Sequence, residues 1–328
     1  MTLHSFLSSA TSTSGGSWAV GLLLFVGAVQ GLKALVRFAS GIYVYYLRPG
    51  KNLKRLGEWA VVTGATDGIG RAYADGLAKK GLNVVLISRT QSKLDTAAAE
   101  VESKFKVKTK TLAVDFGKAN DATWSMLKAE LAELAVGVLV NNVGVSYPHA
   151  EYYEAIDDQL IDDLININIQ ATNKMTRMVL PGMKQRKRGA IVNIGSAAAT
   201  VAPSGPLYAV YAGTKAYVDM FSKSLDLEYR QFGISCHNQA PAYVATKMSK
   251  IRKPTMDAPS PANWVKAAIA HIGYEVTQCP FPYHGAMWGI VSSAPLSVVN
   301  LYLLHFHLLL RKKYYKKLER ETAKAKGQ

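Results

Sequence analysis

Thr63-Gly64-Ala65-Thr66-Asp67-Gly68-Ile69-Gly70 is the stretch that decides the fold of this chain. It follows a short apolar run at residues 59–62, which is typical of a buried parallel strand. It precedes residues 71–80, which have the composition of a helix. Strand, glycine-rich turn and helix in this order form the context of a dinucleotide site.

Each glycine of the stretch has a separate use in such a site. Gly64 permits the tight turn, Gly68 lets the backbone approach a pyrophosphate, and Gly70 lets the helix pack close to the strand. The alternative is a turn without a ligand, but several glycines in one turn cost conformational entropy on folding. The stretch therefore predicts a bound dinucleotide, with the spacing G-x-x-x-G-x-G rather than the commoner G-x-G-x-x-G.

The rest of the chain repeats the alternation of strand and helix. Strand-like runs lie at residues 59–63, 83–88, 111–115, 138–142, 190–195 and 234–239. Helix-length segments separate them, and two long helices are expected at residues 157–183 and 207–232. This alternation predicts an α/β fold, a Rossmann-type doubly wound parallel sheet in a single catalytic domain over residues 51–285.

A second motif carries chemistry. Tyr211 and Lys215 are four residues apart, so on a helix they share one face. An isolated tyrosine has a pKa of about 10, and a nearby cation favours the phenolate. The pair is therefore suited to general acid/base work on a carbonyl or an alcohol.

Together these features resemble the classical short-chain dehydrogenase/reductase family. Asn141-Asn142-Val143-Gly144 is similar to the family's N-N-A-G element, and Asn168 matches its helix asparagine. Ser196, after the fifth strand-like run, matches the catalytic serine, and Pro241-Ala242 stands where Pro-Gly is usual. The resemblance covers residues 57–250 and implies catalytic roles for Tyr211, Lys215, Ser196 and Asn168.

One departure from the family pattern concerns spacing. Ser196 lies 15 residues before Tyr211, where the family has 13. Tyr208 is an alternative acid, but it has Ala212 rather than a lysine four residues on. Ser204 is an alternative serine, but it lies in a Pro-Ser-Gly-Pro turn. We keep Ser196 and Tyr211 and interpret the extra residues as a longer loop at the mouth of the site.

The cofactor is predicted to be NADPH. The second strand-like run ends at Arg89, where an NAD site would place an acidic residue for the ribose hydroxyl. An arginine suits the 2′-phosphate of NADPH, although it could also simply end the strand in solvent. The resemblance implies no metal ion and the following cofactor residues: Gly64, Thr66, Asp67, Gly68, Ile69, Gly70, Arg89, Asp115, Asn142, Gly144, Tyr211, Lys215 and Thr246.

The resemblance also implies a mechanism. Hydride from NADPH reduces a ketone, Tyr211 protonates the oxygen, and Ser196 donates a hydrogen bond to that oxygen. Lys215 lowers the pKa of the tyrosine and holds the nicotinamide ribose, while Asn168 fixes a water in the proton relay.

The charge of the chain is distributed unevenly. The net charge is +16 over 328 residues, but residues 1–32 carry no charged side chain. Residues 33–55 carry six basic and no acidic residues, and residues 311–328 carry eight basic and two acidic ones. Because the basic segments flank apolar ones, the pattern indicates a membrane surface rather than nucleic acid. Two cysteines are too few for a disulfide framework.

The first fifty residues are expected to anchor the chain. Residues 13–32 are uncharged with an apolar centre, and twenty helical residues span about 30 Å. A cleaved signal peptide would carry positive charge before the apolar run, whereas here it follows at Lys33. Residues 1–50 are thus predicted to be a transmembrane anchor whose basic flank keeps the catalytic domain in the cytosol.

The last segment, residues 286–328, is predicted to be membrane-associated with a basic tail. Its apolar stretch, residues 286–310, is interrupted by Pro295 and could span the membrane, enter one leaflet or cover the catalytic domain. Since the tail is basic, an interfacial or re-entrant arrangement is favoured. Lys324 and Lys326 resemble the K-x-K-x-x signal for retrieval to the endoplasmic reticulum, although an ordinary solvated tail explains them too.

The resemblance narrows to the microsomal very-long-chain 3-oxoacyl-CoA reductase branch, which includes 17β-hydroxysteroid dehydrogenase-like members. Residues 47–53 and 247–261 carry it, and the form around Tyr211 is most similar to plant-type members. It implies reduction of long-chain 3-oxoacyl-CoA in fatty-acid elongation at the endoplasmic reticulum membrane, together with other elongation enzymes. Lys247, Lys250, Arg252 and Lys253 could meet coenzyme A phosphates or simply be solvated.

Two alternatives to this function stay open. One is a steroid or retinoid ketoreductase with the same catalytic residues. The other is a non-catalytic scaffold of the elongation complex, which the complete catalytic set argues against. The sequence leaves chain length and homo-oligomer formation undecided.

Overall fold

The structure is a computed structural model that describes the backbone of residues 14–326 and the side chains of residues 18–325. Residues 1–13, the first part of the predicted anchor, and Gly327 and Gln328, at the end of the retrieval-like tail, lie outside the described residues. The chain divides into two compact units, Met1–Pro49 and Gly50–Gln328.

The first unit is a helix. It consists of α2 (Ser14–Ile42) followed by a π-helical turn, η1 (Tyr43–Leu47). Within it, Trp18–Leu47 is long and apolar enough to cross a membrane, and none of its most apolar window is buried inside the protein. Within the described ranges no other helix meets that test of length and composition.

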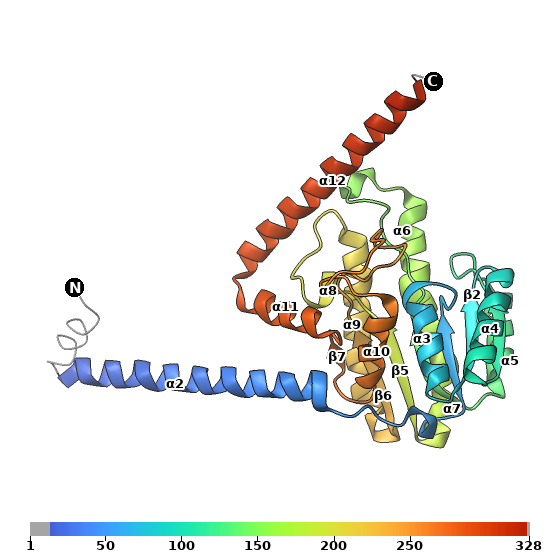
Figure 1. Cartoon of the computed structure of the whole chain (residues 1–328), viewed down its shortest axis with the longest axis horizontal. Helices are drawn as coiled ribbons and strands as arrows, with labels where there is room; N and C mark the ends of the chain where they lie inside the picture. The colour runs from blue at the N-terminus through green and yellow to red at the C-terminus, as the bar shows by residue number, and fades with distance from the viewer. Residues whose placement is uncertain (1–13, 327–328) are drawn as a thin grey trace. The chain divides into compact units, whose positions relative to one another are not determined.

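The second unit contains a seven-stranded parallel sheet in the order β3-β2-β1-β4-β5-β6-β7, which confirms the predicted Rossmann-type fold (Figure 1). The strands are β1 (Trp59–Thr63), β2 (Asn83–Ser88), β3 (Thr109–Ala113), β4 (Val136–Asn141), β5 (Gly189–Ile194), β6 (Ile234–Gln239) and β7 (Thr277–Gln278). The sequence did not indicate β7, because two polar residues form no apolar run.

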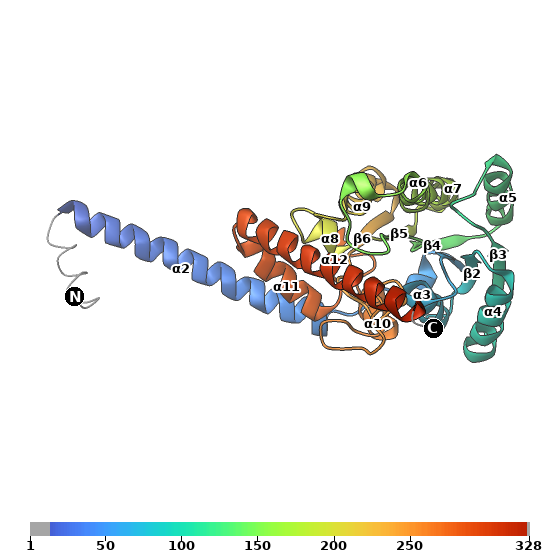
Figure 2. The ribbon, with the colours of Figure 1, turned by 90° about the horizontal axis from the view of Figure 1, so that it is seen from above.

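Each face of the sheet has its own apolar core. Along β1, Val62 packs into one core and Val61 into the other, as successive side chains of a strand point to opposite faces. The helices covering the Val62 face are α3 (Gly68–Lys79), α4 (Gln91–Phe105) and α10 (Pro261–Ala270). The Val61 face is covered by α5 (Asp121–Ala132), α7 (Ala171–Arg186) and α9 (Ala209–Tyr229). Figure 2 shows these two layers on either side of the strands.

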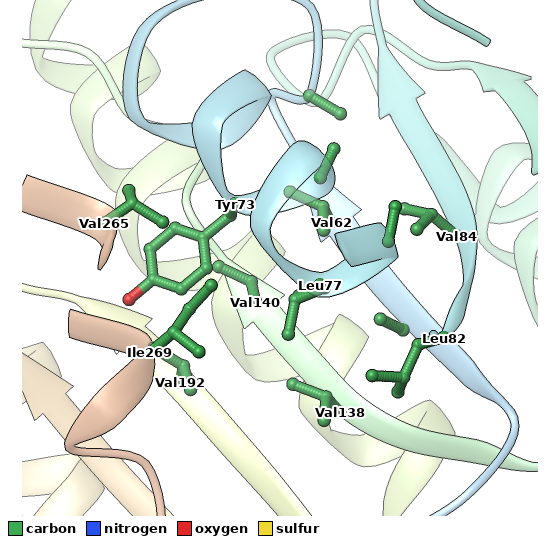
Figure 3. Packing of buried hydrophobic residues seen from close by; sticks show 14 of the residues in the cluster. Val62, Tyr73, Leu77, Leu82, Val84, Val138, Val140, Val192, Val265 and Ile269 are labelled. Carbon is green, nitrogen blue, oxygen red and sulfur yellow. The ribbon is translucent and has the colours of Figure 1, made fainter. Parts of the chain in front are cut away.

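Tyr73 connects three elements of the first core. It projects from α3 toward Val265 and Ile269 of α10 (Figure 3). Its ring meets Trp264 edge-on with centroids 6.4 Å apart, and its hydroxyl donates to the Gln239 side chain of β6. This buried hydroxyl therefore has a partner, as a buried polar group requires.

The predicted long helix over residues 157–183 contains a local change of helix type. The structure has α6 (Asp158–Ile165), a π-helical turn η4 (Asn166–Gln170) and then α7. Single π-helical turns inside α-helices occur frequently at functional sites. Asn168, a predicted site residue, lies at the centre of this turn.

The C-terminal segment forms two helices, α11 (Pro282–Ser293) and α12 (Leu296–Lys326). The chain breaks between them at Ala294-Pro295, where the sequence placed the interruption. α11 begins before residue 286, the expected boundary of the last segment, because Pro282 starts the helix at a position that needs no N–H donor. The shorter elements are η2 (Leu53–Arg55), η3 (Tyr153–Ala155), α8 (Ala197–Thr200) and η5 (Arg230–Phe232).

Candidate active site

The glycine-rich turn joins β1 to α3. Gly64 and Gly68 have φ values of +66° and +56°, in the left-handed region that favours glycine. A Cβ atom on Gly70 would lie 2.2 Å from the Gly64 carbonyl oxygen, so no larger residue fits there. Asp67 caps α3 by accepting a 2.8 Å hydrogen bond from the Gly68 amide.

The end of β4 is fastened to this turn. The Thr63 hydroxyl accepts hydrogen bonds from the backbone amides of Asn142 (2.9 Å) and Val143 (3.0 Å). The Asn142 side-chain amide donates to the Thr63 carbonyl at 2.9 Å. Asn142, predicted from the N-N-A-G element, thus fixes the separation of two strand ends.

The predicted residues for the adenosine end lie around the end of β2. The Thr66 and Ser88 hydroxyl oxygens are 2.9 Å apart, and Ile69 packs against the core. Arg89 is exposed and forms no ion pair with any residue that the structure describes. Asp115, just beyond β3, accepts a 3.1 Å hydrogen bond from the Gly117 amide.

The loop after β6 approaches the glycine-rich turn from the other side. A Cβ atom on Gly68 would lie 3.4 Å from Cγ2 of Thr246, so Thr246 faces the turn. The neighbouring Lys247 forms a 2.6 Å ion pair with Asp67. Both side chains are exposed, so this pair contributes little to stability.

Two members of the basic run therefore have partners inside the protein. Lys247 is paired with Asp67, and the Lys250 ammonium donates to the Pro148 carbonyl at 2.8 Å. Arg252 and Lys253 are exposed, and no described side chain pairs with them. These two remain the candidates for contact with an anionic substrate group.

Ser196 and Tyr211 meet despite the longer spacing between them. Ser196 caps α8, and its hydroxyl accepts a 3.2 Å hydrogen bond from the Ala198 amide. Burial raises the pKa of Tyr211, and a hydrogen bond from the Ser196 side chain partly offsets this. The two side chains therefore form one hydrogen-bonded pair. The intervening residues form α8 and the loop that precedes α9.

The two alternative residues are occupied elsewhere. The Ser204 hydroxyl donates to the Asn300 side chain of α12 at 2.6 Å. The Tyr208 ring lies between those of Tyr147 and His307, with centroid distances of 5.3 and 5.1 Å. Burial raises the pKa of Tyr208 to about 12. These contacts favour Ser196 and Tyr211 as the reacting pair.

Lys215 lies on α9 one helical turn after Tyr211 and is buried, with 6% of its surface exposed. Its ammonium donates a 2.8 Å hydrogen bond to the Ile194 carbonyl at the end of β5. Burial lowers the pKa of Lys215 to about 8. The sequence predicted that Lys215 lowers the pKa of Tyr211, but the net shift of the tyrosine pKa is upward, because desolvation outweighs the hydrogen bond from Ser196.

Asn168 is held rigidly beside Lys215. Its side chain accepts from the Val145 amide at 2.9 Å and donates to the Val145 carbonyl and the Thr214 hydroxyl. A Cβ atom on Gly144 would lie 3.2 Å from the Asn168 oxygen and 3.6 Å from the Lys215 ammonium. Gly144 thus marks the point where both side chains converge.

The sequence did not indicate several positioning residues. Thr63 holds the ends of β1 and β4 together, and Thr214 accepts a hydrogen bond from Asn168. Tyr147 fixes the start of α9, because its hydroxyl accepts a 3.1 Å hydrogen bond from the Val210 amide. The position of Thr63 between an apolar strand and Gly64 is a weak signal that could have suggested it. Tyr147 carries no such signal, because its partner is a backbone amide 63 residues away.

These groups lie along the carboxyl edge of one parallel sheet, where open α/β sheets bind ligands. The capped α3 N-terminus and its close-approach glycines fit a pyrophosphate, and a buried lysine with a Ser–Tyr pair fits a carbonyl or alcohol. The fold and site thus define an oxidoreductase that uses a nicotinamide dinucleotide.

Comparison with known proteins identifies the family. Residues 58–257 match the family described as short chain dehydrogenase, and the chain belongs to this family. It is 46% identical over 305 residues to very-long-chain 3-oxoacyl-CoA reductase-B of Danio rerio, covering 90% of this chain and 96% of that protein. It is 41% identical over 300 residues to a very-long-chain 3-oxoacyl-CoA reductase-like protein of Arabidopsis thaliana, covering 90% and 96%.

A solved relative has the same fold. The short-chain dehydrogenase from Sphingobium yanoikuyae in complex with NADPH is 27% identical, with a TM-score of 0.60 over 72% of this chain and 96% of that one. The predicted resemblance to the long-chain reductase branch is confirmed. The plant-type likeness around Tyr211 stays a local prediction, since the plant relative is not more similar overall than the fish protein.

Lys215 gives a prediction about pH. Above about pH 8 its buried amine is neutral in the free protein, whereas an anionic dinucleotide favours the charged form. We expect the dissociation constant of NADPH to rise above pH 8, by up to about tenfold per pH unit. Fluorescence titration of NADPH on either side of pH 8 measures this.

The matched variant is Lys215→Met, which keeps the length of the side chain without its charge. It should bind NADPH more weakly and show no such rise. A rise of the same steepness in Lys215→Met would assign the effect to another group.

Proposed function

We propose that this protein reduces very-long-chain 3-oxoacyl-CoA to 3-hydroxyacyl-CoA with NADPH in fatty-acid elongation. The observation that carries the proposal is 46% identity along nine tenths of the chain to a protein named for that reaction. The assembled Ser196, Tyr211, Lys215 and Asn168 support it, because a scaffold without activity has no need of a buried lysine beside a Ser–Tyr pair.

Tyr211 is the proton donor in this proposal. When bound, NADPH supplies a hydride to the carbonyl carbon of the substrate. A free tyrosine has a pKa of about 10, and burial raises the pKa of Tyr211 further, so at neutral pH it is in the protonated form that can protonate the developing alkoxide. Ser196, already hydrogen-bonded to Tyr211, donates to the same substrate oxygen and stabilises its charge.

Lys215 and Asn168 support this step. The charged ammonium of Lys215 favours proton release from Tyr211 electrostatically and holds the ribose next to the nicotinamide. Asn168 fixes the Val145 backbone and Thr214, and in this proposal it would also hold a water of the proton relay. Thr246, which faces Gly68 of the turn, would contact the nicotinamide amide of the bound cofactor.

Arg89 selects NADPH over NADH. It stands at the end of β2, is exposed, and lacks a partner among the described side chains, so its guanidinium is available for a 2′-phosphate. An acidic residue at this place would favour the free hydroxyl of NADH instead. Thr66, Asp67, Ile69, Asp115 and Gly144 complete the cofactor site.

The site works at the endoplasmic reticulum membrane, with the catalytic unit in the cytosol. The candidate span Trp18–Leu47 is followed by basic residues, which favour the cytosolic side. Residues 1–50 serve as the anchor, 51–285 as the catalytic domain and 286–328 as a membrane-associated segment. Lys324 and Lys326 act as a retrieval signal, and other elongation enzymes supply the substrate and remove the product.

The substrate assay tests the proposal directly. Membranes containing the protein should oxidise NADPH with long-chain 3-oxoacyl-CoA esters and much more slowly with steroid ketones. The 3-hydroxyacyl-CoA product is identified by mass spectrometry. Faster turnover of a steroid ketone than of every acyl-CoA ester would refute the assigned substrate.

Tyr211→Phe tests the proton donor. The variant should lose at least about 100-fold in rate, because general acid catalysis contributes that much, while its affinity for NADPH changes little. Tyr208→Phe is the matched control and should retain most of the activity. The opposite pattern, with Tyr208→Phe inactive and Tyr211→Phe active, would exchange the two assignments.

Arg89→Ala tests the cofactor choice. Removal of a charge-assisted hydrogen bond should weaken NADPH binding by about tenfold or more and leave NADH binding nearly unchanged. Lys79→Ala, an exposed cation at the far end of α3, is the control and should affect neither cofactor. Equal weakening of both cofactors by Arg89→Ala would mean that Arg89 is structural.

A further inference from the structure

Helix α12 carries a stripe of residues that docks on the catalytic unit. Each turn of the helix contributes one or two members at spacings of three or four residues, so they share one face: Val299, Asn300, Leu303, Phe306, His307, Arg311 and Tyr315. Asn300 accepts from the Ser204 hydroxyl at 2.6 Å, and the His307 ring nitrogen lies 2.7 Å from the Pro206 carbonyl oxygen. Both partners lie in the loop that leads into α9 and Tyr211.

Glu151 fixes the far half of this stripe. Its carboxylate is buried, with 6% of the residue exposed, and accepts hydrogen bonds from Arg311 (2.6 Å), Tyr315 and the Tyr152 amide (2.8 Å). Burial alone would raise the pKa of Glu151, but the hydrogen bonds from Tyr315 and Arg311 lower it to about 2. Withdrawal of α12 would remove two of these three partners from the carboxylate and leave only the Tyr152 amide, so the pairing holds the helix on the catalytic unit.

The opposite faces of α11 and α12 are apolar and uncovered. Ile290 is 71% exposed and Leu301 is 70% exposed. The other exposed apolar residues here are Tyr283, Met287, Leu296, Val298, Tyr302, Leu304 and Leu309. We call this set the outer apolar face. Apolar helix surface is normally buried, so we expect the outer apolar face to contact another protein or a membrane.

The outer apolar face ends abruptly in lysines. One turn beyond Leu309 the exposed residues of α12 are Lys312, Lys313, Lys316 and Lys317. Apolar residues followed by a cluster of lysines match acyl chains followed by anionic headgroups. A second copy of the chain fits less well, because lysine is depleted in protein interfaces.

A membrane-spanning arrangement of α12 also fits poorly. Residues 296–310 form a helical stretch of about 22 Å, which is shorter than a bilayer core. The same stretch contains Asn300 and His307, which are hydrogen-bonded to the catalytic unit. Crossing the bilayer would break these contacts and the Arg311–Glu151 pair.

We propose that the outer apolar face lies along the surface of an anionic bilayer, with its lysines on the headgroups, while the inner stripe stays docked on the catalytic unit. The proposal rests on the proposed membrane location but not on the identity of the substrate. It places the loop before Tyr211 next to the lipid, where a long acyl chain partitions.

An environment-sensitive probe tests this arrangement in the full-length protein. Leu301→Cys is labelled with a nitrobenzoxadiazole dye and reconstituted into phosphatidylcholine vesicles with and without phosphatidylserine. Cys236 and Cys279 are buried and should label little, which the unsubstituted protein checks. Glu133→Cys, at the exposed end of α5, is the matched control.

We expect blue-shifted, severalfold brighter emission at Leu301→Cys, quenched more by lipids with a quencher near the headgroup than by lipids with one at the chain end. Glu133→Cys should behave as in water. Water-like emission at Leu301→Cys would overturn the proposal. Emission that is independent of lipid but depends on protein concentration would instead assign the face to a second copy.

The side of the membrane on which the end of α12 lies distinguishes a helix that lies on the membrane from one that crosses it. In sealed microsomes, a membrane-impermeant maleimide should label Lys317→Cys and Glu133→Cys to the same extent without detergent. Labelling of only one of the two would show that α12 crosses the bilayer. Neither readout depends on catalysis, so failure of the acyl-CoA assay and failure of this proposal are distinguishable.

Discussion

The hydroxyl of Thr63 holds together the two strand ends on which the whole site depends. Parallel strands β1 and β4 are neighbours, but their chains leave the sheet in opposite directions, toward α3 on one face and toward Asn168 on the other. Thr63 satisfies two amides of the departing β4 chain, and Asn142 returns a bond to the β1 chain. The crevice that opens between the two chains is the place where α/β folds of this type bind dinucleotides.

Burial sets the electrostatics of the catalytic group. Desolvation raises the pKa of Tyr211 and lowers that of Lys215, so each is pushed toward its neutral form. Within the part of the chain that the structure describes, the Ile194 carbonyl is the one hydrogen-bond acceptor of this ammonium group, which is a modest partner for a charge so deeply buried. An anionic ligand beside Lys215 would favour the charged form of the lysine. The charged lysine would in turn make Tyr211 a stronger acid, so ligand binding and the acidity of the tyrosine depend on each other.

Much of this arrangement was predictable from the sequence. The parallel sheet, the long helices and the meeting of Ser196 with Tyr211 follow from apolar runs and from motifs that short segments encode. What escaped prediction depends on contacts between distant segments. β7 has no apolar pattern and forms only because β6 offers a free edge. In the sequence Glu151 is an ordinary acidic residue, because its partners Arg311 and Tyr315 lie 160 or more residues further along the chain. The upward pKa shift of Tyr211 likewise depends on burial, which the Tyr-x-x-x-Lys pattern does not contain.

The π-helical turn at Asn166–Gln170 allows one continuous helical segment to pack against two different neighbours. An α-helix advances by about 100° per residue, so one additional residue in a turn rotates everything that follows by about that angle. Before the step, α6 lies against α9, and after it α7 lies against β4 and β5. A straight helix of constant phase would present the same stripe throughout and could not follow both neighbours. Asn168 sits within the step itself, and its amide bonds both to the backbone of Val145 and to the Thr214 hydroxyl of α9. Removal of a single residue here would therefore put α6 and α7 back in phase and turn one of them away from its neighbour, although every side chain needed for chemistry would still be present.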